Sequence, residues 1–421
     1  GQRWGYFAET GRYGAALAAM ERAAGMNRGR LSPSAVEVLY GSSCRMSASR
    51  IDQINSCHFS YFMRYGLRAR ERTPAGFDAS RVGSFLHFIL ERVTSAVMER
   101  GGFAQVGERE LGCLTDEAVQ SYMDQSLPGF DKRDERFKYL FRRLRKTVKT
   151  IVSNVAGELA SSDFVPVAFE LGFGEGEAMP PISVRVGGAS LTVAGRVDRV
   201  DGWLSEGKLY LRVVDYKSGK KSFSLSDVCH GLNIQMLLYL FALKREGQAL
   251  FGHEIIPAGV LYLPARDVLV SKPRGTSPQE LQAALDRELR RSGLVLSRPE
   301  VLRAMEHSAL EEPRFLPLSV GRGGVCGGLA SAEELGKLER YVDHLLKKIA
   351  RELREGVIDA DPCFSSESDN ACVYCEFASA CNFTDGEGGD RCRPLRPVKP
   401  EEFWGQISVM TGEEGWPWQS N

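Results

Sequence analysis

The stretch that decides the fold is Gly195-Arg196-Val197-Asp198, followed by Val213-Val214-Asp215-Tyr216-Lys217. Two runs typical of β-strands, residues 191–194 and 209–214, lead into these motifs. If the two runs form a hairpin, Asp198 and Asp215 come together at one end of a sheet. Two carboxylates and a lysine placed there can hold a hard divalent cation and an attacking water, which is the minimal equipment for cutting a phosphodiester.

Asp198 and Asp215 are the predicted ligands of Mg²⁺, since this ion prefers oxygen ligands and keeps several waters. The backbone carbonyl of Tyr216 is a further predicted ligand. Lys217 lies two residues after Asp215, so on a strand both side chains point to the same face. We expect Lys217 to orient or help deprotonate the water, or to stabilise charge on the phosphate. The alternative is an ordinary surface salt bridge, because an isolated Asp-x-Lys often arises by chance.

Four more residues are candidates for the same site. Glu170 lies in an earlier β-like segment and is expected to position a ligand or a water. Gln235 and Tyr239 are four residues apart on a predicted helix, so they share a face that is expected to contact the scissile phosphate or the lysine. His87 lies on an apolar helix, where a lone histidine is more often a core residue. Beside a metal site it becomes a predicted ligand through its neutral imidazole.

The composition is that of a globular protein: 43% of the 421 residues are hydrophobic and 26% are charged. No apolar run approaches the ~20 residues of a membrane helix, so no membrane partner is expected. Because no signal-like segment opens the chain, we expect a cytoplasmic location. The start without Met suggests an excised part of a longer protein.

Net charge is zero, so any surface for nucleic acid has to be local. The best candidate is the basic stretch 132–149. It is interpreted either as a solvated helix face or as a face that follows phosphates.

Three cysteines form a compact motif, C-x₂-C-x₅-C, at Cys372, Cys375 and Cys381. Three thiolates need a fourth ligand, and Cys57 is the best donor although it lies 372 − 57 = 315 positions earlier. Cys363 and Cys392 are rival donors. Soft four-sulfur sites hold zinc or an iron–sulfur cluster, and the spacing does not choose between them. Such a centre would clamp the two ends of the domain together, because closing a long loop is worth on the order of 5 kcal/mol in the chain-entropy model.

The order of predicted elements gives an α/β fold, with a small mixed sheet flanked by helices. Hydrophobic periodicity predicts helices at about 80–100, 114–160, 231–244 and 332–355, and strands within 165–214 and at 255–263. Residues 264–330 are rich in Pro, Gly and Arg, and we expect them to form a peripheral insertion.

Taken together, these motifs resemble AddB-type nuclease domains, which belong to the RecB-like branch of the PD-(D/E)XK nucleases. The segments that carry the resemblance are Ser47 to Ile51, Cys57 to Leu67, Gly83 to His87, Gly195 to Asp198, Asp215 to Lys217, Gln235 to Tyr239 and the three clustered cysteines. The resemblance covers about 45–385 and implies a restriction-endonuclease-like sheet. It divides the chain into a linker or remnant of a helicase-like region (1–45), a nuclease domain (46–390) and a C-terminal tail (391–421).

The resemblance also implies cofactors and partners. It predicts a [4Fe–4S] cluster on Cys57, Cys372, Cys375 and Cys381. It predicts Mg²⁺-dependent cutting of single-stranded DNA by a site containing His87, Asp198, Asp215 and Lys217, during resection of double-strand breaks with an AddA-like helicase–nuclease subunit. Glu170 matches the family's acid only roughly, and His58 stands where Pro often follows the first Cys. Two alternatives stay open: a non-catalytic DNA-binding module on a nuclease fold, and a zinc-stabilised interaction domain.

Overall fold

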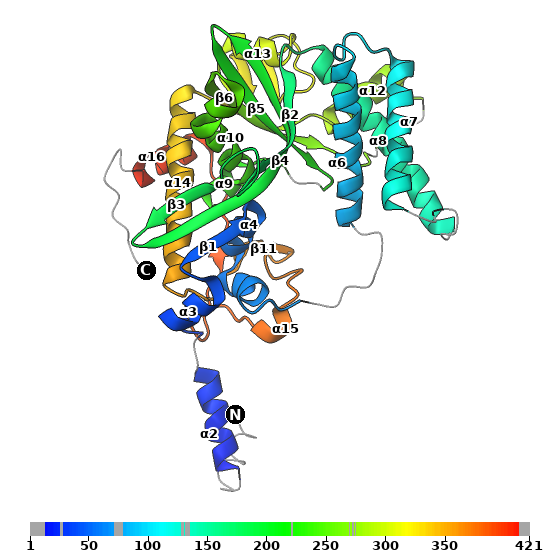
Figure 1. Ribbon diagram of the computed structural model, residues 1–421. Coiled ribbons are helices and arrows are strands. Elements are labelled where there is room, and N and C mark those ends of the chain that lie inside the picture. Colours follow the sequence, from blue (N-terminus) through cyan, green and yellow to red (C-terminus); the bar gives the residue numbers. More distant parts are fainter. Residues whose placement is uncertain are drawn as a thin grey trace.

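A mixed sheet forms the centre of the protein, seen here in a computed structural model that describes residues 13–411 except 26–27, 71–78, 128–129, 131–134, 220–221, 269, 272 and 274. The strands run in the order β1-β4-β5-β6-β7-β10, and β2 and β3 pair with different parts of β4. Their bounds are β1 (Ser43–Ser47), β2 (Val165–Phe173), β3 (Ile182–Val186), β4 (Ala189–Ser205), β5 (Lys208–Lys217), β6 (Glu254–Pro264), β7 (Ser292–Leu296) and β10 (Leu329–Ala330). Figure 1 shows helices around this sheet, which is the predicted α/β arrangement.

The predicted hairpin is formed by β4 and β5, which pair antiparallel with Arg199 opposite Val214 and Asp201 opposite Arg212. A two-residue turn joins them. Both turn residues, Glu206 (φ 51°) and Gly207 (φ 76°), have positive φ, as type I′ hairpin turns require. This turn fixes the register and therefore decides which residues reach the end of the sheet.

A parallel crossover follows the hairpin. Helix α10 (Gln235–Glu246) connects β5 to the parallel strand β6 and packs on both of them. Its residues from Met236 to Leu243 are all buried, as expected of a helix that is apolar on every side. The helix therefore places Gln235 and Tyr239 beside the sheet rather than in solvent.

Three long helices lie together on another side of the sheet (Figure 1): α6 (Ala79–Glu99), α7 (Glu108–Ser126) and α8 (Glu135–Ala160). Phe85 of α6 makes edge contacts with Tyr122 of α7, at a centroid distance of 5.0 Å, and with Phe141 of α8, at 5.3 Å. These aromatic contacts fix α6, which carries His87 two residues after Phe85.

Helices α14 (Ala332–Arg354) and α16 (Pro400–Met410) lie on the side of the sheet away from α6, α7 and α8 (Figure 1). A capping box of Ser331 and Glu334 starts α14. The shorter helices are α2 (Gly14–Gly25), α3 (Pro33–Tyr40), α4 (Ala48–Ser56), α5 (His58–Tyr61), the π-helix η1 (Phe62–Gly66), α9 (Leu225–Cys229), α11 (Gln248–Phe251), α12 (Pro278–Glu288), α13 (Pro299–Met305) and α15 (Ala378–Cys381). The small strands are β8 (Leu318–Gly321), β9 (Gly324–Gly327), β11 (Cys363–Ser366), β12 (Asp369–Asn370) and β13 (Arg393–Pro394). None of the described helices has the length and apolarity needed to cross a membrane.

The segment 264–330 is not wholly peripheral, which corrects the expectation from its composition. Its strands β7 and β10 extend the central sheet, β7 antiparallel to β6 and β10 parallel to β7. The apolar run Leu294-Val295-Leu296 is buried. Burial of these three residues places β7 in the sheet, although the sequence around them is rich in turn-forming residues. At the chain's other end, β13 pairs with β11, and Phe403 and Ile407 of α16 are buried. The part of the predicted tail that the structure describes, up to residue 411, therefore packs with the rest of the fold. The domain boundaries themselves stay predictions.

Candidate functional site

The predicted acid pair meets at the end of the β4–β5 hairpin. One carboxylate oxygen of Asp198, Oδ2, accepts a hydrogen bond from the backbone N–H of Tyr216 at 2.6 Å. The neighbouring residue Asp215 points to the same place, and both acids are about nine-tenths buried. The Lys217 Nζ lies 2.6 Å from Asp215 Oδ2 and 5.0 Å from the centre of the Tyr262 ring. The expected acid–acid–lysine grouping is therefore present in the geometry, while the roles of its members stay predictions.

Burial and the nearby charge of Asp198 raise the pKa of Asp215, and the Lys217 ammonium opposes that rise. Two buried carboxylates that repel each other are costly unless a cation offsets their charge. Two cations, Lys217 and His87, face three acids, Asp198, Asp215 and Glu170, so negative charge is in excess. The site thus fits a divalent cation, and oxygen donors are those that Mg²⁺ prefers.

Glu170 reaches this site through an unusual backbone conformation. It lies on β2 between Phe169, opposite Arg199, and Leu171, opposite Val197, so it stands across from Asp198. Its φ is 45°, a left-handed conformation that is uncommon for a residue other than glycine. Strain of this kind persists only where the surrounding structure enforces it, and it concentrates at functional sites. The sequence pattern favoured Glu170 only weakly, whereas the structure places it in the acid group.

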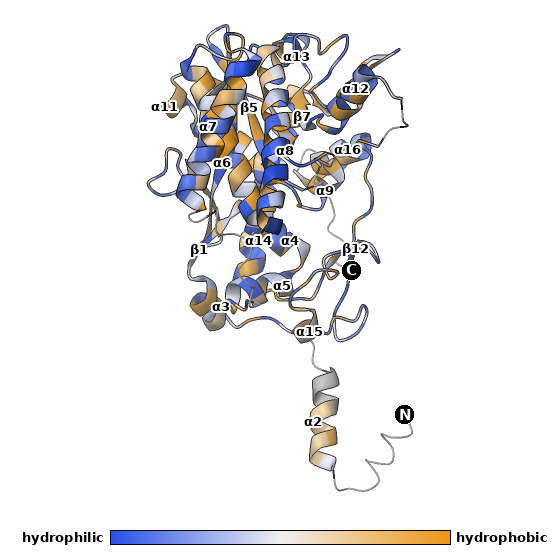
Figure 2. Ribbon diagram, turned by 90° about the vertical axis from the view of Figure 1, so that its right-hand side faces the viewer, coloured by the Kyte–Doolittle hydropathy of each residue, from blue (hydrophilic) through white to orange (hydrophobic). Residues whose placement is uncertain are grey.

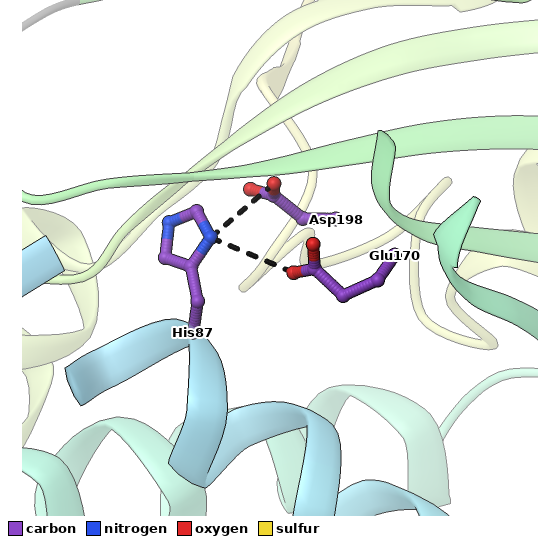
Figure 3. Close-up of side chains that lie close together, drawn as sticks. All are labelled: His87, Glu170 and Asp198. Carbon is purple, nitrogen blue, oxygen red and sulfur yellow. Dashed lines mark ion pairs between the residues drawn. The ribbon is translucent and has the colours of Figure 1, made fainter. Parts of the chain in front are cut away.

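His87 of α6 completes the group, as Figure 3 shows. Its Nδ1 lies 3.3 Å from Asp198 Oδ1 and 3.8 Å from Glu170 Oε1. Its Nε2 donates to the Tyr216 carbonyl at 3.2 Å, because a carbonyl can only accept. The ligand atoms of His87, Glu170 and Asp198 all lie within 4.8 Å of one another.

The protonation of His87 depends on what occupies the site. Burial lowers the pKa of His87, but the hydrogen bonds to Asp198 and Glu170 outweigh it and bring the pKa to about 10. Without a metal the imidazole is therefore a cation between two carboxylates. A metal bound at Nδ1 would have to displace that proton. The Tyr216 carbonyl, a predicted metal ligand, here accepts the Nε2–H of His87, so Nδ1 is the nitrogen that would lose its proton to a metal.

Gln235 and Tyr239 share a face of α10, as their spacing predicts, and the Gln235 side chain opposes the rise in the pKa of Tyr239. The ring of Tyr239 stacks on Phe173 at 5.1 Å and is 2% exposed. Burial raises the pKa of Tyr239 to about 12. Its hydroxyl meets the β4 backbone at Gly195, where a Cβ atom would overlap it and lie 2.8 Å from Cζ. A glycine is therefore required at this position by the approach of Tyr239.

Four cysteines line one cavity of about 180 Å³ between the start of α5 and the region of α15: Cys57, Cys372, Cys375 and Cys381. All four are free thiols. The two rival donors lie elsewhere, since Cys363 donates to the carbonyl of Asn55 and Cys392 to Asp385. The structure therefore groups Cys57 with the other three, and four soft sulfur donors fit zinc or an iron–sulfur cluster. Burial raises the pKa of Cys57 to about 12, so this thiol ionises only when a metal binds.

Arg28 lies beside this cavity and contacts residues that line it, and no sequence motif pointed to it. Its guanidinium binds both carboxylate oxygens of Asp390, at 2.9 and 2.8 Å, and donates to the carbonyl of Cys381 at 2.8 Å. It also lies 4.3 Å from the centre of the Phe59 ring. One cation thus ties residues near both ends of the described chain around the cysteine cavity.

A buried charge cluster lies behind the metal site, and the sequence motifs did not predict it. Arg199 and Arg212 are fully buried on the face of the sheet opposite Asp198 and bind Asp201, each through a 2.8 Å contact. Glu158 of α8 contacts both arginines and lies 2.7 Å from Arg291. A signal was present, because Arg199, Asp201 and Arg212 interrupt strands that are otherwise apolar. Charged residues at such positions have to find partners inside the fold.

Comparisons with known proteins agree with this geometry. The family described as the PD-(D/E)XK nuclease superfamily matches residues 45–382. The chain is 32% identical over 379 residues to an ATP-dependent helicase/deoxyribonuclease subunit from Ruminiclostridium cellulolyticum, covering 88% of this chain and 33% of the relative. A protein of the same name from Desulforudis audaxviator is 33% identical over 390 residues, covering 91% and 33%. The chain spans about a third of the length of the curated relatives it matches.

Proposed function

Because this chain belongs to the PD-(D/E)XK nuclease superfamily, as its motifs predict, we propose that it is a metal-dependent deoxyribonuclease that cuts single-stranded DNA. The observation that supports this most is that acidic and basic side chains from three strands and one helix converge at one place. These residues are His87, Glu170, Asp198, Asp215 and Lys217. A structural ion pair would need neither the strained Glu170 nor two acids side by side.

The chain's own residues prepare hydrolysis in the following way. Asp198, Asp215, Glu170 and Nδ1 of His87 would hold Mg²⁺, which supplies Lewis-acid polarisation of the phosphate when it is bound. The Tyr216 carbonyl keeps the proton of His87 on Nε2, so that Nδ1 is available. Lys217, whose Nζ lies 2.6 Å from Asp215 Oδ2, would donate hydrogen bonds to the attacking water or to a phosphate oxygen, where negative charge grows during attack.

The four cysteines are proposed to hold a [4Fe–4S] cluster that clamps the ends of the domain. The cavity they share supports a metal centre, and the resemblance to AddB-type domains favours iron–sulfur over zinc. Anaerobic purification followed by metal analysis and a visible spectrum tests this. We expect a brown protein that contains iron and sulfide, whereas a colourless protein with one zinc would contradict the assignment.

The proposed setting is repair of double-strand breaks in the bacterial cytoplasm. The relatives' names describe one subunit of a helicase/deoxyribonuclease, which supports a partner that unwinds DNA and delivers a single strand. Co-purification with an AddA-like helicase–nuclease subunit tests that part separately from the chemistry.

The catalytic proposal is tested with Asp215→Ala and Lys217→Ala. We expect the first to abolish Mg²⁺-dependent cleavage of a labelled single strand and the second to slow it by roughly 10²–10³-fold, the usual cost of removing one group that stabilises developing charge. Lys208→Ala is the matched control, because Lys208 starts the same strand and pairs with Glu254 at the surface. Full activity of Asp215→Ala would refute the assignment. Binding without cleavage by the unaltered protein, with any divalent metal, would favour a DNA-binding module.

A further inference from the structure

A groove of about 570 Å³ lies between α8, the segment after β6 and the end of α12. We propose that this groove binds single-stranded DNA and guides it along the edge of the sheet that carries Lys217. The proposal extends the proposed nuclease function by naming the path of its substrate. Three observations carry it: the distribution of charge on α8, an exposed tyrosine, and the contacts of the groove walls with elements that carry the site.

Six of the basic residues of α8 divide into two sets. Figure 2 shows a run of strongly hydrophilic residues along this helix. Lys132 and Arg133 of the predicted basic stretch lie outside the described residues. Four of the described cations are paired with acids away from the groove: Lys138 and Arg142 with Glu135, and Arg145 and Lys149 with Asp116 of α7. For this set the solvated-face interpretation is adequate.

The second set lines the groove. Arg143 and Lys146 come from α8 and Arg266 from the segment after β6. Asp267 is the one acid among the described lining residues, and it accepts a hydrogen bond from Arg143 Nε at 2.7 Å. Arg266 also contacts the exposed Glu288 at 3.3 Å, so three cations face two acids and the wall stays positive in a chain whose net charge is zero. A phosphate could take the place of Asp267 on Arg143.

Tyr139 adds an aromatic surface to the same wall. It lines the groove and is 61% exposed. Tyr139, Arg143, Lys146 and Thr150 follow one another at helical spacing, so they form one continuous stripe on α8. Cations that follow a backbone, together with an aromatic ring on which a base can stack, are the usual elements of a single-strand site. In a DNA duplex the bases stack on one another, so none of them exposes a face on which the ring of Tyr139 can stack. The exposed Tyr139 therefore favours a single strand.

Both structural elements that form the groove walls contact elements that carry the proposed metal site. The backbone N–H of Ala265 donates to the Lys217 carbonyl at 2.8 Å, and Arg266 is the next residue. Helix α8, which forms the other wall, packs on α6 through its opposite face: Phe141, which is not among the lining residues, lies 5.3 Å from Phe85, two residues before His87. A strand held in the groove therefore lies along elements that also position Lys217 and His87.

The experiment measures binding of a fluorescent oligothymidine by the cluster-containing protein, without added divalent metal so that no cleavage occurs. For Lys146→Ala and Arg266→Ala we expect weaker binding. The slope of log K against log salt should fall by about 0.7 for each phosphate contact removed. Tyr139→Ala should weaken binding roughly 5- to 150-fold, the range measured for one stacked base, and Tyr139→Phe should restore it. Asp267→Asn should tighten binding because it releases Arg143.

Lys149→Ala is the control, since it removes a cation of the same helix that faces Asp116. If the groove variants match this control in affinity and in salt slope, the groove is not the path of the strand. The two proposals fail separately. Cleavage by Asp215→Ala would refute the nuclease assignment and leave the groove standing. Normal binding by the groove variants, with cleavage lost in Asp215→Ala, would refute only the groove.

Discussion

Removing the charge of Glu158 tests whether the buried cluster behind the metal site stabilises the fold. The perturbation is Glu158→Gln, which keeps the size of a side chain that is 1% exposed. Burial alone would raise the pKa of Glu158, but Arg291, Arg212 and Arg199 outweigh it and lower the pKa from 4.5 to about 2. At 1.36 kcal/mol per unit, this difference corresponds to roughly 3 kcal/mol of stability at neutral pH. Removing one partner of a buried ion pair costs about the same, roughly 3–5 kcal/mol.

The sign of the pH dependence follows from a pKa that is lower in the folded state. The contribution of Glu158 is complete above about pH 4.5 and is lost as the pH falls towards about 2. The glutamine variant has no such titration. The gap in the free energy of unfolding between the two proteins should therefore be constant from pH 8 to 6, and about 1 kcal/mol smaller at pH 4.

The assay is anaerobic urea unfolding, followed by tryptophan fluorescence and by circular dichroism at each pH. The two probes have to coincide, because a protein with a bound cofactor need not unfold in two states. Glu333→Gln serves as the control, since that carboxylate is exposed on α14 beside Lys337. Equal midpoints for wild type and Glu158→Gln at pH 7 would refute the reasoning, as would a gap that does not narrow at pH 4.

Two further predictions concern close approaches at the two candidate sites. Gly195→Ala should push Tyr239 away from β4 and lower the rate of cleavage by on the order of 100-fold, because a misplacement of about 1 Å can cost that much. Steady-state kinetics measures the rate, and a melting curve checks that the variant is folded. An unchanged kcat would contradict the close approach of Tyr239 to Gly195. Arg28→Ala should release iron faster in air, since it removes the contacts to Asp390 and Cys381. The decay of visible absorbance measures this, with Arg30→Ala, which removes only an exposed pair with Glu355, as the control that should behave like wild type.

The sequence was informative where the pattern is local. Two strand-like runs, each leading into an acidic motif, predicted the β4–β5 hairpin, and the i, i+4 spacing predicted the shared face of Gln235 and Tyr239. The compact cysteine motif predicted a soft-ligand centre, and its three members line one cavity together with Cys57. In each case the spacing along the chain nearly fixes the spacing in space.

The rest depends on contacts between distant segments. The left-handed backbone of Glu170 follows from how β2 pairs with β4, and no residue type indicates it. The hydrogen bond from His87 Nε2 to the Tyr216 carbonyl follows from the approach of α6 to β5. Strand β7 is only five residues long and lies in a turn-rich segment. Five residues are too few for hydrophobic periodicity to identify a strand there. One partner of Arg199, Glu158, likewise comes from α8, 41 positions away.

The spread of the cysteines along the chain has a consequence for biosynthesis. The proposed catalytic side chains are complete once Tyr239 has been made, whereas Cys381 follows 381 − 239 = 142 residues later. At roughly 5–20 residues per second, a ribosome needs about 7–28 s to cover that distance. During this interval the nascent chain carries every residue that would hold Mg²⁺ but lacks the last ligand that ties its ends together. Insertion of the proposed cluster would thus act as a checkpoint, so that the proposed phosphodiester-cutting domain would become stable only after the last of the four cysteines has left the ribosome.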